Sequence, residues 1–204
     1  VGSEMCIRDS SGIDNIITVD LHQDAIQGFF DIPVNHMTAM PIFVDYYRSM
    51  GFDPEQLCVV SPDVGRAKAA KKFSTALDCD IAIMHKDRPK HNQAEITALI
   101  GDVKGKDVII VDDMVDTAGT ITKAADIMKE AGAKSVRAFA SHCVMSGPAS
   151  ERVQSSALEE IVFTDSIPYT DRCSKVKQLS VADLFEETIR RVVDNKSISS
   201  QYLL

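Results

Sequence analysis

One run, VIIVDDMVDTAGT at residues 108–120, combines acidic, small and hydroxylated residues that could bind a ligand. Four β-branched aliphatic residues open it and predict a central strand that is buried on both faces. Two acids, Asp112 and Asp113, follow where we expect that strand to end. Carboxylates at the carboxyl end of a parallel strand can accept hydrogen bonds from sugar hydroxyls or hold a metal ion.

The residues after the acids are a second feature. They are small, hydroxylated or conformationally permissive, so their backbone can approach a ligand closely. These residues are Asp116, Thr117, Ala118, Gly119 and Thr120. A helix is expected next, and the free N–H groups at a helix start favour a phosphate. The alternative is an ordinary turn with Asp and Thr as helix caps. Because acids, loop and helix coincide, we predict a site for a phosphorylated sugar.

Strand and helix patterns alternate along the chain, which predicts an α/β fold with a parallel, doubly wound sheet. We expect strands at 13–21, 57–60, 81–84, 108–111, 136–141 and 160–164. We expect helices at 40–50, 67–77, 148–154, after Thr120 and after a Ser180 cap. The last helix should bury a stripe of Val181, Leu184, Phe185, Ile189 and Val192.

Two more candidates lie where predicted strands end. Asp63 follows the strand at 57–60, at the edge where α/β sheets bind ligands, although many such Asp residues are only helix N-caps. His22 follows the first strand and could contact a metal or a phosphate, but a histidine taken alone is more often structural.

A basic segment, HKDRPKH, interrupts this acidic chain at residues 85–91. Lys86, Arg88 and Lys90 alternate, so an extended backbone would point them to one side. Most charge runs are solvated loops. Phosphoryl-transfer sites, however, need mobile cations that can close on developing negative charge.

Composition excludes several classes of function. The chain has 204 residues, a net charge of -8 and a pI near 5.1, which argues against a nucleic-acid or anionic-membrane surface. It has no apolar run long enough for a bilayer. Five scattered cysteines predict reduced thiols in a cytoplasmic protein. The first ten residues, VGSEMCIRDS, lack the features of a signal peptide and resemble translated adaptor sequence, so we expect native sequence from about Ser11.

Residues 108–120 resemble the phosphoribosyl-diphosphate binding motif that type I phosphoribosyltransferases share with the ribose-phosphate diphosphokinase family. The string DLHQDAIQGFFDIPV, at residues 20–34, is similar to a signature of the diphosphokinases alone, with Ala25 in place of a usual Gln. The segment HKDRPKH resembles their catalytic flexible loop, with Asp87 where relatives often have Arg. The sequence VGRAK after Asp63 departs from them by lacking a longer Gly-rich insertion.

The resemblance runs from about Ser11 to Leu204 and implies the later part of a subunit with two similar domains. Residues 1–10 would be a non-native leader and 11–35 the last strand of a truncated first domain. Residues 36–204 would be a domain like the type I phosphoribosyltransferases. The resemblance further implies a cytoplasmic homo-oligomer, a hexamer, that uses Mg²⁺ and ATP to diphosphorylate ribose 5-phosphate.

The resemblance also implies roles for individual residues. Lys86 and Arg88 would be catalytic cations, and His22 and Asp63 would hold the metal-nucleotide. Ribose 5-phosphate would bind to Asp112, Asp113, Asp116, Thr117, Ala118, Gly119 and Thr120. A regulatory Ser-x-Ser would correspond to Ser197 and Ser199, while Asn35 and Thr38 depart from the family's residues.

Three alternatives stay open. The first is a phosphoribosyltransferase with the same phosphate loop, against which the signature at 20–34 and the Lys86/Arg88 segment speak. The second is a non-catalytic regulatory subunit, against which the presence of both cations and both acids speaks. The third is that the polypeptide as given is an inactive piece of its parent.

Overall fold

The computed structural model describes residues 11–90, 93–171 and 173–198, apart from the side chains of 86–90 and 93–97. The described residues form two compact units. The smaller unit comes from residues 11–39 and 181–198, and the larger is Met40–Ser180. The sequence had placed one boundary after residue 35 and everything beyond it in a single domain. In the structure, the segment after Ser180 groups instead with the first strands.

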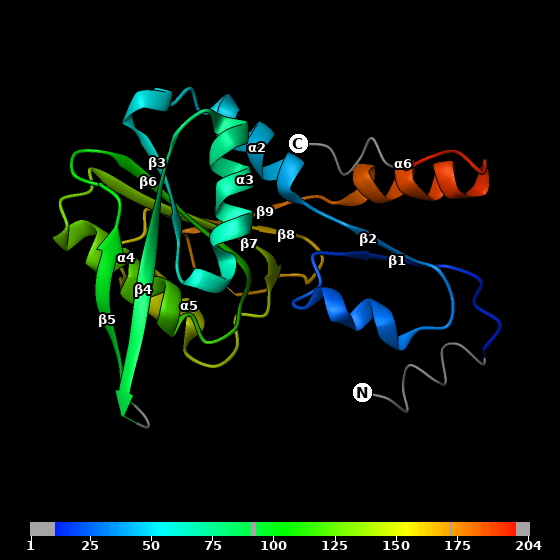
Figure 1. Ribbon diagram of the computed structural model, residues 1–204, viewed down its shortest axis with the longest axis horizontal. Coiled ribbons are helices and arrows are strands. Elements are labelled where there is room, and N and C mark those ends of the chain that lie inside the picture. The colour runs from blue at the N-terminus through cyan, green and yellow to red at the C-terminus, as the bar shows by residue number, and fades with distance from the viewer. Residues whose placement is uncertain (1–10, 91–92, 172, 199–204) are drawn as a thin grey trace. The chain divides into compact units, whose positions relative to one another are not determined.

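The larger unit is a seven-stranded sheet with helices on both faces (Figure 1). The order is β5-β4-β3-β6-β7-β8-β9, and all neighbours are parallel except β4 and β5. The strands are β3 (Leu57–Ser61), β4 (Asp80–Lys90), β5 (Gln93–Ile100), β6 (Asp107–Val115), β7 (Ser135–Cys143), β8 (Glu160–Thr164) and β9 (Val176–Leu179). The helices are α2 (Met40–Ser49), α3 (Ala67–Leu77), α4 (Gly119–Glu130) and α5 (Ala149–Ser155), with 3-10 turns η2 (Pro54–Gln56) and η3 (Val64–Arg66). The predicted α/β class and parallel, doubly wound sheet are confirmed.

Alternation along β6 builds a core on each face of the sheet. Val108 and Ile110 belong to a buried cluster with residues of α4 and α5. Ile109, between them in the sequence, is just as buried but is not part of that cluster. On the face of α2 and α3, the ring of Phe139 stacks on Phe43 at 4.3 Å and meets Phe73 at 4.5 Å. Aromatic pairs of this kind add about 0.5–1.5 kcal/mol beyond their buried area. The apolar run therefore anchors β6 rigidly in the centre of the sheet.

β6 is longer than predicted. We expected it to end before the acids, but it continues to Val115. Its pairing with β7 explains this, because the ladder includes Asp112↔Ala140 and Val115↔Cys143. On the other side, the ladder with β3 stops at Val60↔Ile110. The two acids therefore lie within β6 and beyond the end of its β3 ladder.

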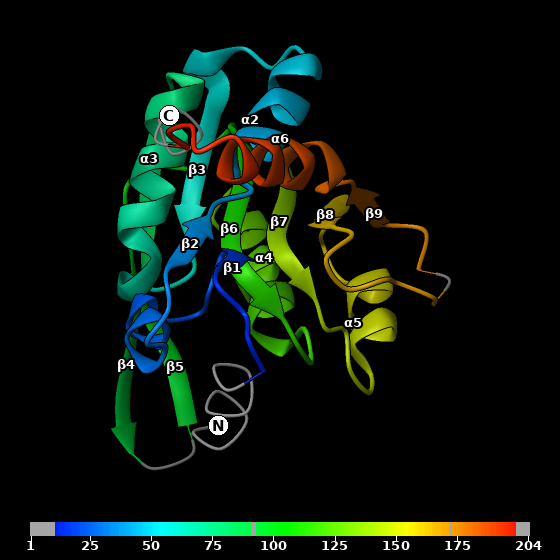
Figure 2. The ribbon, with the colours of Figure 1, turned by 90° about the vertical axis from the view of Figure 1, so that its right-hand side faces the viewer.

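The basic segment at 85–91 also differs from expectation. We predicted a strand only at 81–84 and a loop after it, but β4 runs on to Lys90 and pairs antiparallel with β5. The register shifts twice along this hairpin, between His85 and Lys86 and between Asp87 and Lys90. The hairpin extends past the other strands of the larger unit (Figures 1 and 2). Pairing with β5 supplies the hydrogen bonds that the charged sequence did not signal.

The smaller unit contains a two-stranded parallel sheet, where the sequence had predicted one strand at 13–21. β1 (Ile16–Val19) pairs with β2 (Val34–Met37) in the register Ile16↔Val34 to Val19↔Met37. A 3-10 helix, η1 (Asp24–Phe29), connects them. The signature string at 20–34 is therefore a strand-to-strand connection.

The smaller unit also contains α6 (Ala182–Val193). Val181 is its N-cap, so the predicted Ser180 cap is wrong by one residue. The predicted buried stripe is also wrong, because none of its five residues is fully buried and Ile189 is 50% exposed. The fully buried residue of α6 is Thr188, whose hydroxyl donates to the Leu184 carbonyl at 2.7 Å. A backbone-bonded threonine lowers the cost of burying a hydroxyl group.

In the parts of the chain that the structure describes, no helix has the length and apolarity to cross a membrane. The cysteines within them, Cys58, Cys79, Cys143 and Cys173, are free thiols. Burial raises the pKa of the Cys58 thiol to about 11, which makes it a poor nucleophile.

Candidate functional site

The acid pair is well buried at the carboxyl end of β6. The side chain of Asp113 is 7% exposed and that of Asp112 is 19% exposed. The Asp113 N–H donates to Asp112 Oδ1 at 2.9 Å. Burial raises the pKa of Asp112 to about 7, and a hydrogen bond with the Asp113 carboxyl adds to this effect. The Asp113 N–H and the Arg66 guanidinium act in the opposite direction and lower that pKa. The negative charge of Asp113 also raises the pKa of Asp112, because adjacent buried carboxylates repel.

Arg66 contacts both acids, and the sequence analysis did not predict it as a site residue. Its Nη2 forms an ion pair with Asp113 Oδ2, and its Nε lies 3.7 Å from Asp112 Oδ1. Arg66 is the last residue of η3, which follows β3. The signal that could have identified it is a basic residue close after the end of a strand next to β6, at the edge where the acids lie.

Asp63 caps η3. Its Oδ1 accepts from the Arg66 N–H at 3.1 Å, while the Ser61 hydroxyl donates to the Asp63 carbonyl at 2.6 Å. The N-cap alternative for Asp63 is therefore correct as a local description. It does not exclude a ligand, because a carboxylate has a second oxygen. Asp63, Arg66 and the acid pair form one connected set within the larger unit.

The small-residue loop leads into a helix, as predicted, but α4 begins at Gly119 and not after Thr120. Ala118 is the N-cap residue, with φ 59°, and no side chain caps this helix. A left-handed conformation costs an L-residue about 1–2 kcal/mol, so the surrounding contacts must hold the turn. The loop thus presents backbone N–H groups at the start of a helix of 12 residues, a geometry suited to phosphate.

Two side chains from outside the loop fix its shape. The Ser146 hydroxyl donates to Asp116 Oδ1, and the Ser146 N–H donates to the Asp116 carbonyl at 3.0 Å. Arg152 of α5 donates from Nη1 to the Thr117 carbonyl at 2.8 Å. The same Nη1 lies 3.6 Å from where a Cβ on Gly119 would be. Arg152 therefore places a positive charge beside Thr117 and Gly119. The sequence analysis did not predict Arg152 as a site residue.

The remaining predicted residues are placed less fully. Lys86 and Arg88 lie in β4, and their side chains are outside the described residues. His22 is exposed and belongs to the smaller unit, whereas Asp63 belongs to the larger one. In the smaller unit the Leu21 N–H donates to His36 Nε2 at 2.8 Å, and Asn35 donates to Asn15 at 2.7 Å.

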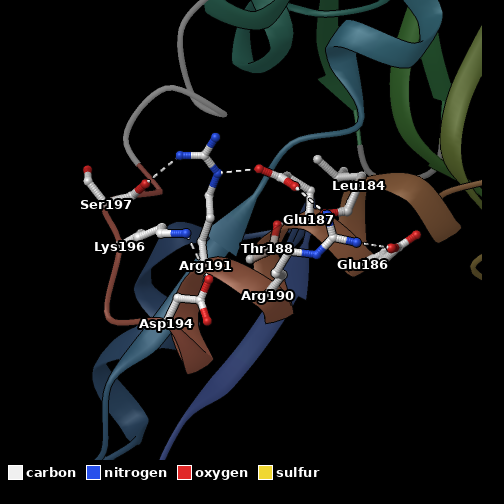
Figure 3. Close-up of polar contacts among 9 residues, drawn as sticks. All are labelled: Leu184, Glu186, Glu187, Thr188, Arg190, Arg191, Asp194, Lys196 and Ser197. Carbon is white, nitrogen blue, oxygen red and sulfur yellow. Dashed lines mark hydrogen bonds and ion pairs between the residues drawn. The ribbon is translucent and has the colours of Figure 1, made fainter.

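The predicted regulatory serines lie just after α6. Ser199 is outside the described residues. The Ser197 carbonyl accepts from Arg191 Nη1 at 3.0 Å, and Arg191 Nε pairs with Glu187 at 2.6 Å (Figure 3). Lys196 pairs with Asp194 at 2.8 Å in the same turn. These contacts hold the segment by its backbone and do not assign a ligand to Ser197.

Among the described residues, no three His, Cys, Asp or Glu side chains gather as a metal-ligand set. Mg²⁺ usually takes one or two carboxylates and completes its shell with waters and substrate phosphates. Asp63 and Asp112 provide hard oxygen donors of that kind. The donor chemistry is thus compatible with Mg²⁺.

A cavity of about 490 Å³ lies at the opposite, amino-end edge of the sheet and includes Asp107 and Ser135, the first residues of β6 and β7. None of the predicted site residues lines it. Four of the charged residues that line it form ion pairs, Lys134 with Asp107 at 3.0 Å and Arg137 with Glu159 at 2.6 Å. Ligands of parallel α/β sheets bind at the carboxyl ends, so we place the site at the acid pair and not in this cavity.

Comparison with known proteins points to one family. The model of the phosphoribosyl synthetase-associated domain matches residues 90–203. A ribose-phosphate pyrophosphokinase of Porphyromonas gingivalis is 55% identical over 196 residues, which cover 96% of this chain and 62% of that protein. One of Fusobacterium nucleatum is 48% identical and covers 95% of this chain and 62% of that protein.

The fold agrees with these similarities. The crystal structure of phosphoribosylpyrophosphate synthetase from Mycobacterium smegmatis superimposes with a TM-score of 0.84 at 38% identity. The match covers 95% of this chain and 63% of that one. The chain therefore spans a little over three fifths of the length of the relatives that it matches.

Proposed function

The chain belongs to the phosphoribosyl synthetase-associated domain family, and from this membership we propose that it serves as the ribose 5-phosphate-binding part of a ribose-phosphate diphosphokinase. Such an enzyme transfers the diphosphoryl group of ATP to O1 of ribose 5-phosphate and releases 5-phosphoribosyl 1-diphosphate and AMP. The observation that carries the proposal is a buried acid pair followed directly by a phosphate-type loop at the start of α4.

The substrate would lie between these two features. Backbone N–H groups from Thr117 to Thr120 would hold the 5-phosphate, and Arg152 would add charge at the same end. The carboxylates of Asp112 and Asp113 would accept hydrogen bonds from the ribose hydroxyls. Fixing the sugar at both ends leaves O1 oriented toward the second substrate, and positioning of this kind supplies much of the catalysis in phosphoryl transfer.

The second substrate would be ATP. Its β-phosphorus would be attacked by the O1 hydroxyl group. Lys86 and Arg88, carried by β4, would neutralise charge that develops on the transferred group. Asp63 and His22 would bind at the metal-nucleotide side. Mg²⁺, when bound, neutralises phosphate oxygens and orients the leaving group.

Larger-scale properties belong to the same proposal. We infer a cytoplasmic homo-oligomer, a hexamer when the whole protein is present, with ADP and phosphate regulation at a site that includes Ser197 and Ser199. The family membership supports this inference, and the anchoring of the Ser197 carbonyl by Arg191 is compatible with it.

The proposal is tested by joining this chain behind the N-terminal part of the P. gingivalis relative that it does not cover. We expect AMP to form from Mg-ATP only when ribose 5-phosphate is present. Lys86→Ala should reduce kcat by about 10²–10³-fold, as expected for losing one transition-state charge contact. Lys72→Ala, at an exposed lysine of α3, is the matched control and should leave kcat unchanged.

Other outcomes would identify the alternatives. Formation of a nucleotide from a nucleobase and phosphoribosyl diphosphate would indicate a phosphoribosyltransferase. Intact ribose 5-phosphate binding without AMP release would indicate a regulatory subunit.

A further inference from the structure

The positive charge of Arg66 offsets the repulsion between the two carboxylates of the acid pair. Asp112 and Asp113 are adjacent in sequence, mostly buried, and in contact through the Asp113 N–H and Asp112 Oδ1. Two carboxylates so close repel one another strongly in a low-dielectric environment. The Arg66 guanidinium reaches both, and its side chain is only 22% exposed. A planar fork of donors suits this arrangement better than a single ammonium group does.

The backbone around Arg66 is fixed as well as its side chain. Its N–H is bound by Asp63 Oδ1 at 3.1 Å. Gly65 is confined too, because a Cβ there would lie 3.2 Å from the same Asp63 oxygen. The ladder between β3 and β6 ends at Ile110, so η3 is placed beside the part of β6 that carries the acids. Arg66 thus connects the end of β3 to the acid pair through a fixed backbone and a side chain that contacts both carboxylates.

We propose that Arg66 is a positioning residue that holds the Asp112–Asp113 pair in the orientation that accepts the ribose hydroxyls. This inference rests on the proposed function, and it specifies that Arg66 acts on the sugar and not on the phosphate. The phosphate loop is held separately, by Ser146 and Arg152. Loss of Arg66 should therefore remove recognition of the hydroxyl groups and leave phosphate binding in place.

The experiment is isothermal titration calorimetry of the 204-residue chain with three probes: ribose 5-phosphate, 2-deoxyribose 5-phosphate and inorganic phosphate. The wild type should prefer ribose 5-phosphate over the deoxy sugar. In Arg66→Ala this preference should disappear, and ribose 5-phosphate affinity should fall about 10- to 100-fold, as for the loss of a charge-assisted contact. Inorganic phosphate affinity should stay within about twofold, because the loop keeps its own supports. Arg66→Lys should restore part of the preference, since a lysine supplies charge without the fork.

Arg137→Ala is the matched control. Arg137 is 17% exposed and bonded to Glu159 at 2.6 Å, but it lies toward the amino end of β7, away from the acid pair. We expect it to retain the sugar preference even though it loses a comparable ion pair. A merely structural role for Arg66 would predict the same behaviour for both variants.

Each outcome bears on the proposal. Retention of the ribose preference in Arg66→Ala would overturn it. If Arg66→Ala loses phosphate binding together with the ribose preference, Arg66→Gln is the deciding variant, since it keeps a hydrogen-bond donor without the charge. Loss of the ribose preference in Arg66→Gln supports the proposed role, and retention of that preference overturns it. A wild type that binds ribose 5-phosphate without any sugar preference overturns this inference alone. A wild type that binds no ribose 5-phosphate refutes the proposed function itself, and this inference with it.

Discussion

The carboxyl group of Asp112 experiences opposing influences, of which those that raise its pKa are the stronger. Burial and the Asp113 carboxyl raise its pKa, the Asp113 N–H and the Arg66 guanidinium lower it, and the result is a pKa of about 7. Near that pH the pair exchanges a proton easily. An ionised carboxylate only accepts hydrogen bonds, whereas a protonated one can also donate. The protonation of this pair therefore affects both folding and the way in which a sugar hydroxyl can be recognised.

We predict a pH-dependent stability difference between the wild type and Asp112→Asn. Below about pH 4 the Asp112 carboxyl is protonated in both the folded and the unfolded chain, so it contributes little. Between about pH 4 and 7 the unfolded chain has released this proton while the folded chain retains it. The free energy of unfolding then falls as pH rises, by up to about 1.4 kcal/mol per pH unit, and levels off above pH 7. The Asn variant has no such proton and should gain stability relative to the wild type across this window.

Urea unfolding of both proteins at pH 4.5 and pH 8 measures this difference. Asp45→Asn, at an exposed position on α2, controls for the loss of one negative charge. An equal difference between wild type and Asp112→Asn at the two pH values would contradict the assignment of a raised pKa to Asp112.

At the residue scale, sequence reasoning found what is encoded locally and missed what comes from folding. Asp112, Asp113 and the residues at 116–120 are candidates from the sequence because acids, small residues and a helix start follow one another along the chain. Arg66, Ser146 and Arg152 were missed because each reaches the site from another segment, and the Arg66–Asp113 contact spans 47 positions in the sequence. No local pattern encodes such a contact. It depends on β3 and β6 being neighbours in the sheet.

At the scale of elements, the hairpin of β4 and β5 depends on close approach of two backbones. Gly101 directly follows β5 and has φ 115°. A Cβ there would lie 2.8 Å from Ala82 Cβ and 2.9 Å from the Ile81 carbonyl oxygen, both in β4. This contact is where the chain leaves the hairpin for β6. The glycine therefore allows the close approach of the two backbones where β5 ends beside β4.

Gly101→Ala should destabilise the larger unit by about 2–4 kcal/mol, because it combines a disfavoured backbone conformation with a clash against backbone atoms. Gly105→Ala is the control, since its φ is also positive, at 74°, but nothing lies within 4 Å of the added Cβ. We expect that control to cost about 1 kcal/mol. Denaturant midpoints measured side by side compare the two. A Gly101→Ala penalty no greater than that of Gly105→Ala would show that close packing is not the cause.

Element prediction succeeded where burial alone decides and failed where pairing decides. The strand at 57–60 and the helix at 67–77 have strong apolar periodicity, and the structure has them within one residue of those limits. The end of β6 was placed too early because acids rarely continue a buried strand, yet β7 pairs with it as far as Val115. The extension of β4 to Lys90 was not predicted because its sequence is charged, yet β5 pairs with it. Hydrogen bonds to a neighbouring strand outweigh an unfavourable local sequence, and that neighbour is not visible in the sequence pattern.

At the scale of the whole molecule, the larger unit holds all the parts of the proposed ribose 5-phosphate site. Arg66, the acid pair, the loop at 116–120 and Arg152 all lie within Met40–Ser180. Its sheet is covered on one face by α2 and α3 and on the other by α4 and α5, and the core residues on both faces belong to the same unit. A unit of this size that buries both faces of its own sheet has what an independent domain requires.

We therefore predict that residues 40–180 fold alone and retain ribose 5-phosphate binding. The isolated segment should unfold in one cooperative transition, with near-UV circular dichroism that reports fixed aromatic packing. Phe139→Ala in this segment is a sensitive probe, because it removes a 3%-exposed ring that stacks on Phe43 and contacts Phe73. The free energy of unfolding should fall by about 3–5 kcal/mol, since a large buried side chain is replaced by a cavity.

Ribose 5-phosphate should raise the unfolding midpoint of the intact segment by mass action, because the ligand binds only the folded form. A segment with helical far-UV signal but no near-UV signal would show that residues 11–39 and 181–198 are needed to complete its packing. A folded segment without any ligand-induced shift would instead place an essential part of the sugar site outside the larger unit.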